Sequence, residues 1–268
     1  MERRRRPGVI LSGAPKAWSR SAEDLIYGIH AVDEALRANE ALLAIHINAA
    51  RGGDPALRGI VAAAKQRNIP VKSEPRAFFE RLPMRAHQGI VAVTPPFPYV
   101  SLHELLQRAP PGNRTFVALD HLTDPHNVGA IARTAEAAGA TGLILPDRRS
   151  AGINATVRKS AAGATAYLPV ARVGNLSAAI RTLKEAGAWA VGADVSESAI
   201  DLGAADFNRD LVLIIGAEDR GVSPLIKREC DYLVRIPMRG RVASLNASVA
   251  AAILLYEALR QRECSLRP

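Results

Sequence analysis

Short polar residues gather in the stretch 236–248, which reads Ile-Pro-Met-Arg-Gly-Arg-Val-Ala-Ser-Leu-Asn-Ala-Ser. It follows a predicted strand at 232–236 and leads into an Ala/Leu/Ile-rich segment that predicts a helix from Ser244 to about Arg262. Gly240 permits backbone angles that other residues avoid, and the hydroxyl of Ser244 is placed to cap the helix. Free N–H groups at such a helix start can bind a polar ligand, although an ordinary strand-to-helix turn has the same spacing.

A second polar segment, Asn127-Val-Gly-Ala-Ile-Ala-Arg133, follows a predicted strand that ends at Asp120. Asn127 is expected to cap the helix that begins there. Gly129 and Arg133 are neighbours on one helical face, and helical side chains lean toward the N-terminus. We therefore expect Arg133 to lie over the turn that Gly129 leaves bare, where a phosphate or ribose can approach. A capped helix with a surface arginine is the alternative.

The third polar segment begins where a buried-strand pattern at 211–216 ends in Gly216, with Glu218 and Gly221 after it. Glycines allow close approach of another backbone or a ligand, and Glu218 can orient a polar partner. The segment lacks the G-x-G-x-x-G spacing of a dinucleotide-binding turn. A nicotinamide-dependent dehydrogenase is therefore disfavoured.

Alternating strand and helix patterns surround these three segments. Strands are predicted at 115–119, 142–145, 167–170, 189–193, 211–216 and 232–236, and helices at 128–138, 155–162, 176–186 and 224–229. Such alternation indicates an α/β fold with a mostly parallel sheet that helices cover on both faces. In such sheets the ligand lies beyond the carboxyl ends of the strands, where all three polar segments begin.

The chain divides into four predicted parts. A basic disordered tail occupies 1–22, a smaller α/β domain 23–98, a proline-bearing linker 99–114, and the larger α/β domain 115–268. In the smaller domain, apolar residues from Leu25 to Leu36 recur at helical spacing. Polar His87 and Gln88 could contact a ligand there, with an exposed turn as the alternative.

Charge and composition narrow the functional class. The net charge is +9, of which the first 20 residues carry +5, with six basic residues and one acidic residue. Such a tail can contact phosphates in a salt-dependent way, or can simply be solvated. The two cysteines, Cys230 and Cys264, have no motif spacing, so neither a disulfide framework nor a thiolate metal site is indicated. A reducing cytoplasm fits, and neither a secretory signal nor a membrane span is predicted.

The predicted C-terminal helix is apolar on nearly all sides as far as Leu255. A helix of this kind needs to be covered on more than one side. We expect a homodimer interface there, with deep burial inside one chain as the alternative.

Taken together, the three polar segments resemble motifs 1, 2 and 3 of the SpoU/TrmH family, the S-adenosylmethionine-dependent RNA ribose 2′-O-methyltransferases of the SPOUT superfamily. The resemblance covers 115–262, with the motifs in order. The region 147–170 looks like the branch that methylates a guanosine of 23S ribosomal RNA. In that branch a domain similar to ribosomal protein L30e precedes the catalytic domain, and the stretches 27–32 and 87–92 are similar to its landmarks.

The resemblance implies a SPOUT-type knotted parallel-sheet catalytic domain with a smaller L30e-like α/β domain that binds RNA, and a homodimer. It implies that S-adenosylmethionine is held by Gly216, Ile236, Met238, Ser244 and Leu245. It implies a catalytic group of Asn127, Arg133, Glu218, Ser244 and Asn246. The charged residues Asp219, Arg220, Arg239 and Arg241 depart from the family pattern and leave the substrate contacts open.

The implied reaction is an in-line attack of a ribose 2′-hydroxyl on the methyl group of the cofactor, for which no metal is required. A guanidinium stays protonated, so Arg133 is a poor base. We expect it to hold the target phosphate and polarise the hydroxyl, with the proton leaving through Ser244, Asn246 or water. Methylation of another ribosomal nucleotide, as by an antibiotic-resistance enzyme, and a non-catalytic role in ribosome assembly are the alternatives.

Overall fold

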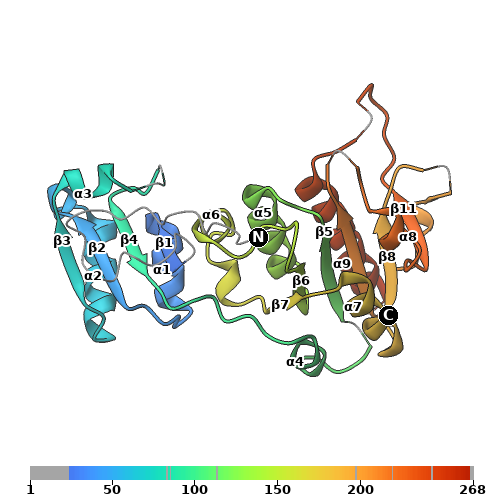
Figure 1. The fold of residues 1–268 in the computed structure, drawn as a ribbon, viewed down its shortest axis with the longest axis horizontal. Helices are drawn as coiled ribbons and strands as arrows, with labels where there is room; N and C mark the ends of the chain where they lie inside the picture. The colour runs from blue at the N-terminus through green and yellow to red at the C-terminus, as the bar shows by residue number, and fades with distance from the viewer. Residues whose placement is uncertain are drawn as a thin grey trace, which may run out of the picture. The chain divides into compact units, whose positions relative to one another are not determined.

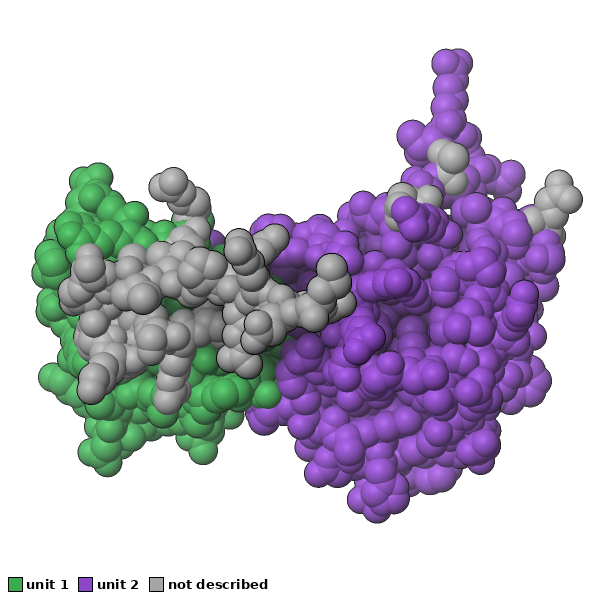
Figure 2. Space-filling view, viewed as in Figure 1, with its two compact units in different colours: residues 1–97, 153–155 green, residues 98–152, 156–268 purple. Residues whose placement is uncertain are grey.

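The computed structural model describes residues 24–82, 84, 86–112, 114–196, 198–218, 220–242 and 244–265. The predicted basic tail at 1–22 lies outside these residues. The chain forms two compact units, which Figure 2 shows in different colours: Met1–Phe97 with Ile153–Ala155, and Pro98–Gly152 with Thr156–Pro268. The division into four parts expected from the sequence stays a prediction.

Unit 1 is built on a four-stranded sheet with the order β1-β4-β2-β3, in which β4 is antiparallel to β1 and β2, and β2 is parallel to β3. Its described elements are β1 (Leu25–Tyr27), α1 (Ile29–Arg37), β2 (Ala44–Asn48), η3 (Ala49–Arg51), α2 (Pro55–Gln66), β3 (Val71–Glu74), α3 (Arg76–Glu80) and β4 (Ile90–Val93).

The predicted helical run from Leu25 to Leu36 is wrong in its first part. Leu25–Tyr27 is a strand paired with β4, and the helix begins only at Ile29. Gly28 separates the two, because its φ of 94° lies in a region that side-chain-bearing residues rarely adopt. The apolar residues of β1 fit the pattern of a short buried strand as well as the start of an amphipathic helix, so their spacing alone does not distinguish the two.

Unit 2 contains a seven-stranded sheet with the order β7-β6-β5-β10-β8-β11-β9, and every registered strand pair in it is parallel. The strands are β5 (Thr115–Asp120), β6 (Gly142–Pro146), β7 (Val170–Val173), β8 (Trp189–Ala193), β9 (Ile200–Asp201), β10 (Leu211–Gly216) and β11 (Tyr232–Arg235). The helices are α4 (Leu102–Gln107), α5 (Pro125–Ala137), α6 (Ala155–Ser160), η4 (Ala164–Ala166), α7 (Leu176–Glu185), η5 (Leu202–Ala204), α8 (Pro224–Lys227) and α9 (Ala247–Ser265).

The predicted α/β class with a parallel sheet is confirmed, and helices lie on both faces of the sheet (Figure 1). One face is covered by α4, α7 and α8, whose Leu105, Ile180 and Ile226 share one apolar core with the strands. On the other face α9 packs against α5 and β10. All six residues of β5 and of β10 are therefore buried, as expected of central parallel strands.

One strand prediction in unit 2 needs correction, and one strand was not predicted. The strand predicted at 167–170 begins only at Val170, because η4 occupies Ala164–Ala166 and Pro169 has no N–H for a sheet ladder. The two-residue edge strand β9 gave no pattern in the sequence. The trefoil knot implied by the resemblance stays a prediction. Within the described residues, none of the helices has the length and apolar character that crossing a membrane requires.

Candidate active site

The three polar segments meet at the carboxyl edge of the unit 2 sheet. β5 and β10 are neighbouring parallel strands, and Asp120 is paired with Gly216 at their ends. The segment that enters α5 and the turn that follows β10 therefore start side by side. The segment between β11 and α9 reaches the same place, because α9 packs against both α5 and β10.

A hydrogen-bonded cluster of three polar side chains joins these segments. Asn127 Nδ2 donates to Glu218 Oε1 over 2.8 Å. Asn246 Nδ2 donates to Asn127 Oδ1 over 2.9 Å and also to Glu218 Oε1. The Ala247 N–H lies 3.4 Å from the same carboxylate oxygen. Glu218 thus accepts from both amides, and each segment contributes one member of the cluster.

Asn127 does not cap α5, so that expectation is wrong. The cap is Asp124, whose carboxylate accepts from the His126 N–H over 3.0 Å, and Pro125 occupies the first turn. Proline at this position costs no hydrogen bond, and aspartate is a favoured cap. Asn127 is consequently inside the helix and only 8% exposed, with its amide committed to Glu218 and Asn246.

Asn246, and not Ser244, caps α9. Its Oδ1 accepts from the Ser248 N–H at 2.9 Å and lies 3.4 Å from the Val249 N–H, and the helix begins at Ala247. Because Oδ1 caps the helix, the Nδ2 of the same amide is left to donate to Asn127 and Glu218. Ser244 is exposed in the segment that leads to the helix.

Gly129 does not leave a bare turn for a ligand, which corrects a third expectation. A Cβ on Gly129 would lie 2.5 Å from Ser160 Cβ and 2.6 Å from the Val157 oxygen, so the glycine permits α5 to pack against α6. Arg133 is exposed one turn later and forms no hydrogen bond or ion pair with any residue that the structure describes. Its guanidinium is available to an external anion, but Gly129 is not part of its surroundings.

The glycines after β10 allow the chain to turn back on itself. A Cβ on Gly216 would lie 2.0 Å from the Gly221 carbonyl carbon, and the Gly221 N–H donates to the Ala217 oxygen over 2.7 Å. Gly221 has a φ of 63°, which favours glycine. This turn, 217–221, holds Glu218 at the edge of the sheet. At Gly216 the missing side chain therefore makes room for the backbone of Gly221 and not for a ligand.

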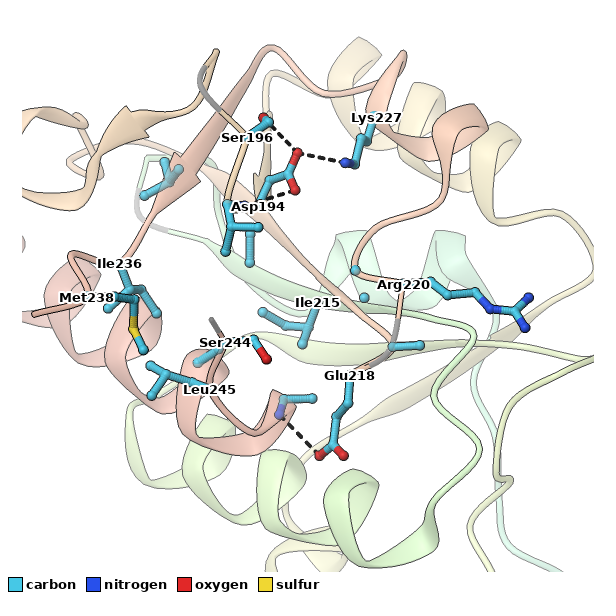
Figure 3. Close-up of a pocket in the computed structure, with 18 residues that line it drawn as sticks. Asp194, Ser196, Ile215, Glu218, Arg220, Lys227, Ile236, Met238, Ser244 and Leu245 are labelled. Carbon is cyan, nitrogen blue, oxygen red and sulfur yellow. Dashed lines mark hydrogen bonds and ion pairs between the residues drawn. The ribbon is translucent and has the colours of Figure 1, made fainter. Parts of the chain in front are cut away.

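A pocket of about 520 Å³ opens beside Glu218. Figure 3 shows the residues that line it. Its lining includes all five residues expected to hold a cofactor: Gly216, Ile236, Met238, Ser244 and Leu245. A pocket of this size with mainly apolar walls suits a ligand of nucleoside dimensions. The sulfur of Met238 and the neighbouring aliphatic side chains offer a surface on which a flat, weakly polar ring can pack.

The residues at the polar end of the pocket were not predicted from the sequence. Asp194, Ser196 and Lys227 line it at the end opposite to Glu218 (Figure 3). Asp194 follows β8, so its position at a carboxyl strand end could have indicated it. Lys227 Nζ lies 2.7 Å from Asp194 Oδ2, and Ser196 Oγ donates to the same oxygen over 2.9 Å.

Burial alone would raise the pKa of Asp194, but the hydrogen bonds from Lys227, Ser196 and the Val195 N–H outweigh it and hold the pKa below its ordinary value. The carboxylate is therefore charged at neutral pH. It can accept hydrogen bonds from a sugar hydroxyl or an ammonium group, and Lys227 can attract a carboxylate. With the apolar walls, these residues fit S-adenosylmethionine, which carries an adenine, a ribose and an amino-acid end.

In the described part of the chain, no group of three or more His, Cys, Asp or Glu side chains is arranged to hold a metal ion. The two histidines near the site have other partners: His121 Nδ1 lies 2.6 Å from Asp120 Oδ1, and His126 Nδ1 lies 3.1 Å from Ser160 Oγ.

Two family models match the chain. Residues 114–256 match the SpoU rRNA Methylase family, and residues 25–100 match the RNA 2′-O ribose methyltransferase substrate binding family. A putative TrmH family tRNA/rRNA methyltransferase, YacO of Bacillus subtilis, is 40% identical over 243 residues, which cover 89% of this chain and 96% of YacO. The 23S rRNA (guanosine-2′-O-)-methyltransferase RlmB of Pseudomonas syringae is 40% identical over 247 residues, which cover 91% and 98%.

Solved structures agree with these matches. The SpoU methyltransferase AviRb from Streptomyces viridochromogenes, in complex with AdoMet, has a TM-score of 0.77 and 26% identity, with 94% of this chain and 95% of AviRb covered. The AdoMet-bound rRNA methyltransferase from Sinorhizobium meliloti has a TM-score of 0.73 and 28% identity, with 91% and 88% covered. Both were determined with the cofactor that the pocket described above fits.

Proposed function

This chain belongs to the SpoU rRNA methylase family and is an S-adenosylmethionine-dependent RNA 2′-O-methyltransferase, and we propose that its target is the ribose of a guanosine in 23S ribosomal RNA. The observation that supports this most is the cluster of Asn127, Glu218 and Asn246 beside a pocket that fits the cofactor. A ribosomal RNA substrate would place the enzyme in the cytoplasm.

The cofactor supplies a methyl group on a positively charged sulfur, which is already activated for transfer. What remains for the chain is to bind and align the two substrates and to help the hydroxyl lose its proton. We assign cofactor binding to Gly216, Ile236, Met238, Ser244 and Leu245, and add Asp194 as an acceptor at the polar end.

The cluster of Asn127, Glu218 and Asn246 fixes the side of the pocket where the ribose would be received. Glu218 is held in one orientation by the two amide donors, so its carboxylate can set the position of a hydroxyl without reorganising. The Ser244 hydroxyl lines the same pocket and can accept or pass on a proton.

Arg133 is assigned to the RNA phosphate. Its guanidinium is exposed and has no partner among the described residues, which suits it to bind a charged group from outside the chain. Lysine keeps the charge but not the planar pair of donors. Arg133→Lys should therefore lower methyl transfer strongly even at saturating RNA. Full activity of Arg133→Lys would contradict the assignment of Arg133 to the RNA phosphate.

The smaller unit is proposed to position the RNA. Its match to a substrate-binding family supports this, and the first 20 residues, which carry a charge of +5, directly precede it in the sequence. We retain the division into a tail at 1–22, an L30e-like RNA-binding domain at 23–98, a linker at 99–114 and a methyltransferase domain at 115–268. Recognition of RNA through its backbone and shape is usual for such modules.

A homodimer through α9 is proposed as the working state. The helix buries Ala251, Leu254 and Leu255 within its own unit, yet Val249 and Tyr256 remain 46% and 50% exposed on another side. They are seven positions apart, which places them on one helical face. The mass of the protein in solution by light scattering would test this, and a monomer at all concentrations would exclude the dimer.

The proposed reaction is tested with labelled S-adenosylmethionine. The wild-type chain should transfer label to unmodified 23S ribosomal RNA and should bind the cofactor in titration calorimetry, while NADH should not bind. Binding of NADH in place of S-adenosylmethionine would contradict the assignment. Cofactor binding without transfer to any ribosomal RNA would favour an assembly role.

A further inference from the structure

A second hollow, of about 640 Å³, opens at the same edge of unit 2. Its lining includes His121 and Thr123 from the segment after β5, Arg149 from the segment after β6, and Ser223 after β10. It shares Ala217, Arg220 and Gly221 with the cofactor pocket. The 217–221 turn that carries Glu218 therefore separates the two pockets, and a ligand in the second would lie next to the ribose side of the first.

Two lining residues of this hollow have unfavourable backbone angles. His121 has a φ of 61° and Arg149 a φ of 58°, in the left-handed region that few residues other than glycine adopt, although histidine does so more often than arginine. Such strain persists only where the surrounding structure enforces it, and it is concentrated at binding and catalytic sites. Here it occurs twice in one hollow, in the segments that follow two neighbouring strands.

The buried carboxylate of Asp120 holds the walls of the hollow together. Asp120 is 2% exposed; its Oδ1 lies 2.6 Å from His121 Nδ1, and its Oδ2 accepts from the Ser223 N–H over 2.7 Å. The Ala151 N–H donates to the Leu122 oxygen over 2.9 Å and so ties the segment after β6 to the segment after β5. The walls of the hollow are therefore held by a buried carboxylate and by a backbone hydrogen bond between the two segments.

The chemistry of the lining favours an anion. Its described members include two arginines, a histidine and hydroxyl groups, and none is acidic. Arg149 is exposed and forms no ion pair or hydrogen bond with another described residue. The carboxylate of Asp120, next to His121, has both oxygens engaged by His121 and the Ser223 N–H. A guanidinium with a neighbouring hydroxyl and imidazole is a suitable set of donors for the oxygens of a phosphate.

We propose that this hollow binds a phosphodiester group of the RNA substrate adjoining the target ribose, with Arg149 as its principal ligand and Asp120 as the residue that positions His121. The proposal rests on the assignment of the chain as an RNA methyltransferase. Arg149 would thus position the RNA on the other side of the Glu218 turn, separately from Arg133 on α5.

The test compares Arg149→Asn with Arg148→Asn in the full chain. Asparagine tolerates the backbone angle at position 149, so the variant removes the charge without adding strain. Arg148 is the adjacent exposed arginine and does not line the hollow, so its variant removes the same charge at a matched site. The measurements are the affinity for a 23S ribosomal RNA fragment at several salt concentrations, the affinity for S-adenosylmethionine, and the KM for RNA.

Arg149→Asn should weaken RNA binding roughly tenfold, which is the loss expected for one charge-assisted contact. The KM for RNA should rise by a similar factor. The slope of log affinity against log salt should become shallower by about 0.7, as for the loss of one phosphate contact to a single strand. Arg148→Asn should change each quantity much less, and both variants should bind the cofactor as the wild type does. Equal RNA binding by the two variants would overturn the proposal, as would weakened cofactor binding with RNA binding unchanged.

Failure of this proposal can be distinguished from failure of the proposed reaction. If the wild type transfers no methyl group, the reaction is wrong, but the RNA-binding comparison of the two variants still decides the role of the hollow. If the wild type methylates RNA and the two variants behave alike, the reaction stands and the hollow is not a phosphate site.

Discussion

The Asn127 amide and the Glu218 carboxylate lie 2.8 Å apart, Nδ2 to Oε1, although 91 positions separate them in the chain. Register makes this possible: β5 and β10 are paired in parallel up to Asp120 and Gly216, so the residues that follow them emerge together. Asn246 completes the cluster from the start of α9. The candidate active site is thus a direct result of strand order, with one polar residue supplied by each of three segments.

Asn246 is predicted to have two separable roles, as a helix cap and as a donor to Asn127 and Glu218. Asn246→Ser keeps an oxygen that can cap α9, but its side chain is too short to reach the cluster. Both variants lose the hydrogen bonds to the cluster, but only serine still caps the helix, so Asn246→Ser should be roughly 1 kcal/mol more stable than Asn246→Ala. Both should lose most methyl transfer. Denaturant unfolding and the transfer assay measure the two effects, and an active Asn246→Ser would refute the donor role.

Gly129 is predicted to be required for packing. In Gly129→Ala the new methyl would meet Ser160 and Val157, and such overpacking costs on the order of 1–3 kcal/mol. The displaced α5 would also move Asn127 away from Glu218, so methyl transfer should fall with stability. Thermal unfolding of the variant measures the first effect.

Gly59 provides the control for that change. It lies inside α2, where a Cβ would have no neighbour within 4 Å. Gly59→Ala should therefore stabilise its unit by about 0.5–1 kcal/mol, because alanine is the better helix former. Similar destabilisation by both substitutions would show that the clash at Gly129 is not the cause.

The two cysteines are predicted to differ in reactivity. Burial, with a smaller contribution from the charge of Asp231, raises the pKa of Cys230 to about 12, so the thiolate is scarcely populated at pH 8. Cys264 is exposed near the end of α9. Iodoacetamide at pH 8 should label Cys264 in the folded protein and both residues after denaturation, as read by mass spectrometry. Rapid labelling of Cys230 in the folded protein would contradict its burial.

Protonation of Asp194 is predicted to contribute to the loss of stability of the folded protein at low pH. Its folded-state pKa is lowered by Lys227, Ser196 and the Val195 N–H despite burial, so its contribution to stability is present above the unfolded pKa of about 4 and is lost as pH falls. Asp194→Asn should be less stable than wild type at pH 7, and the difference should shrink below about pH 4.

Urea unfolding at several pH values measures that difference. Asp201→Asn is a suitable control, because Asp201 is 55% exposed in its ion pair with Arg235 and solvent screens such pairs. A stability difference for Asp194→Asn that does not change with pH would show that the carboxylate charge is not responsible.

The roles given to the site residues come from the family resemblance and stay predictions. The parallel sheet and the polar segments at its carboxyl edge could be predicted from the sequence, because long apolar strands and the polar residues after them are local signals. The hydrogen-bond partners could not. The N-caps fell on Asp124 and Asn246 and not on Asn127 and Ser244, because several polar residues in each segment compete for one position. Gly129 packs against Ser160 and Val157, which lie about 30 positions further along the chain. Asp194 forms its ion pair with Lys227, a residue on another element.

The proposed reaction is tested most directly by incubating the purified chain with S-adenosylmethionine and unmodified 23S ribosomal RNA, and by mapping modified nucleosides with nuclease digestion and mass spectrometry. The wild type should produce 2′-O-methylguanosine at one position, and Asn246→Ser should not. A methyl group on a base, or no methylation of ribosomal RNA while the cofactor is bound, would contradict the proposed reaction.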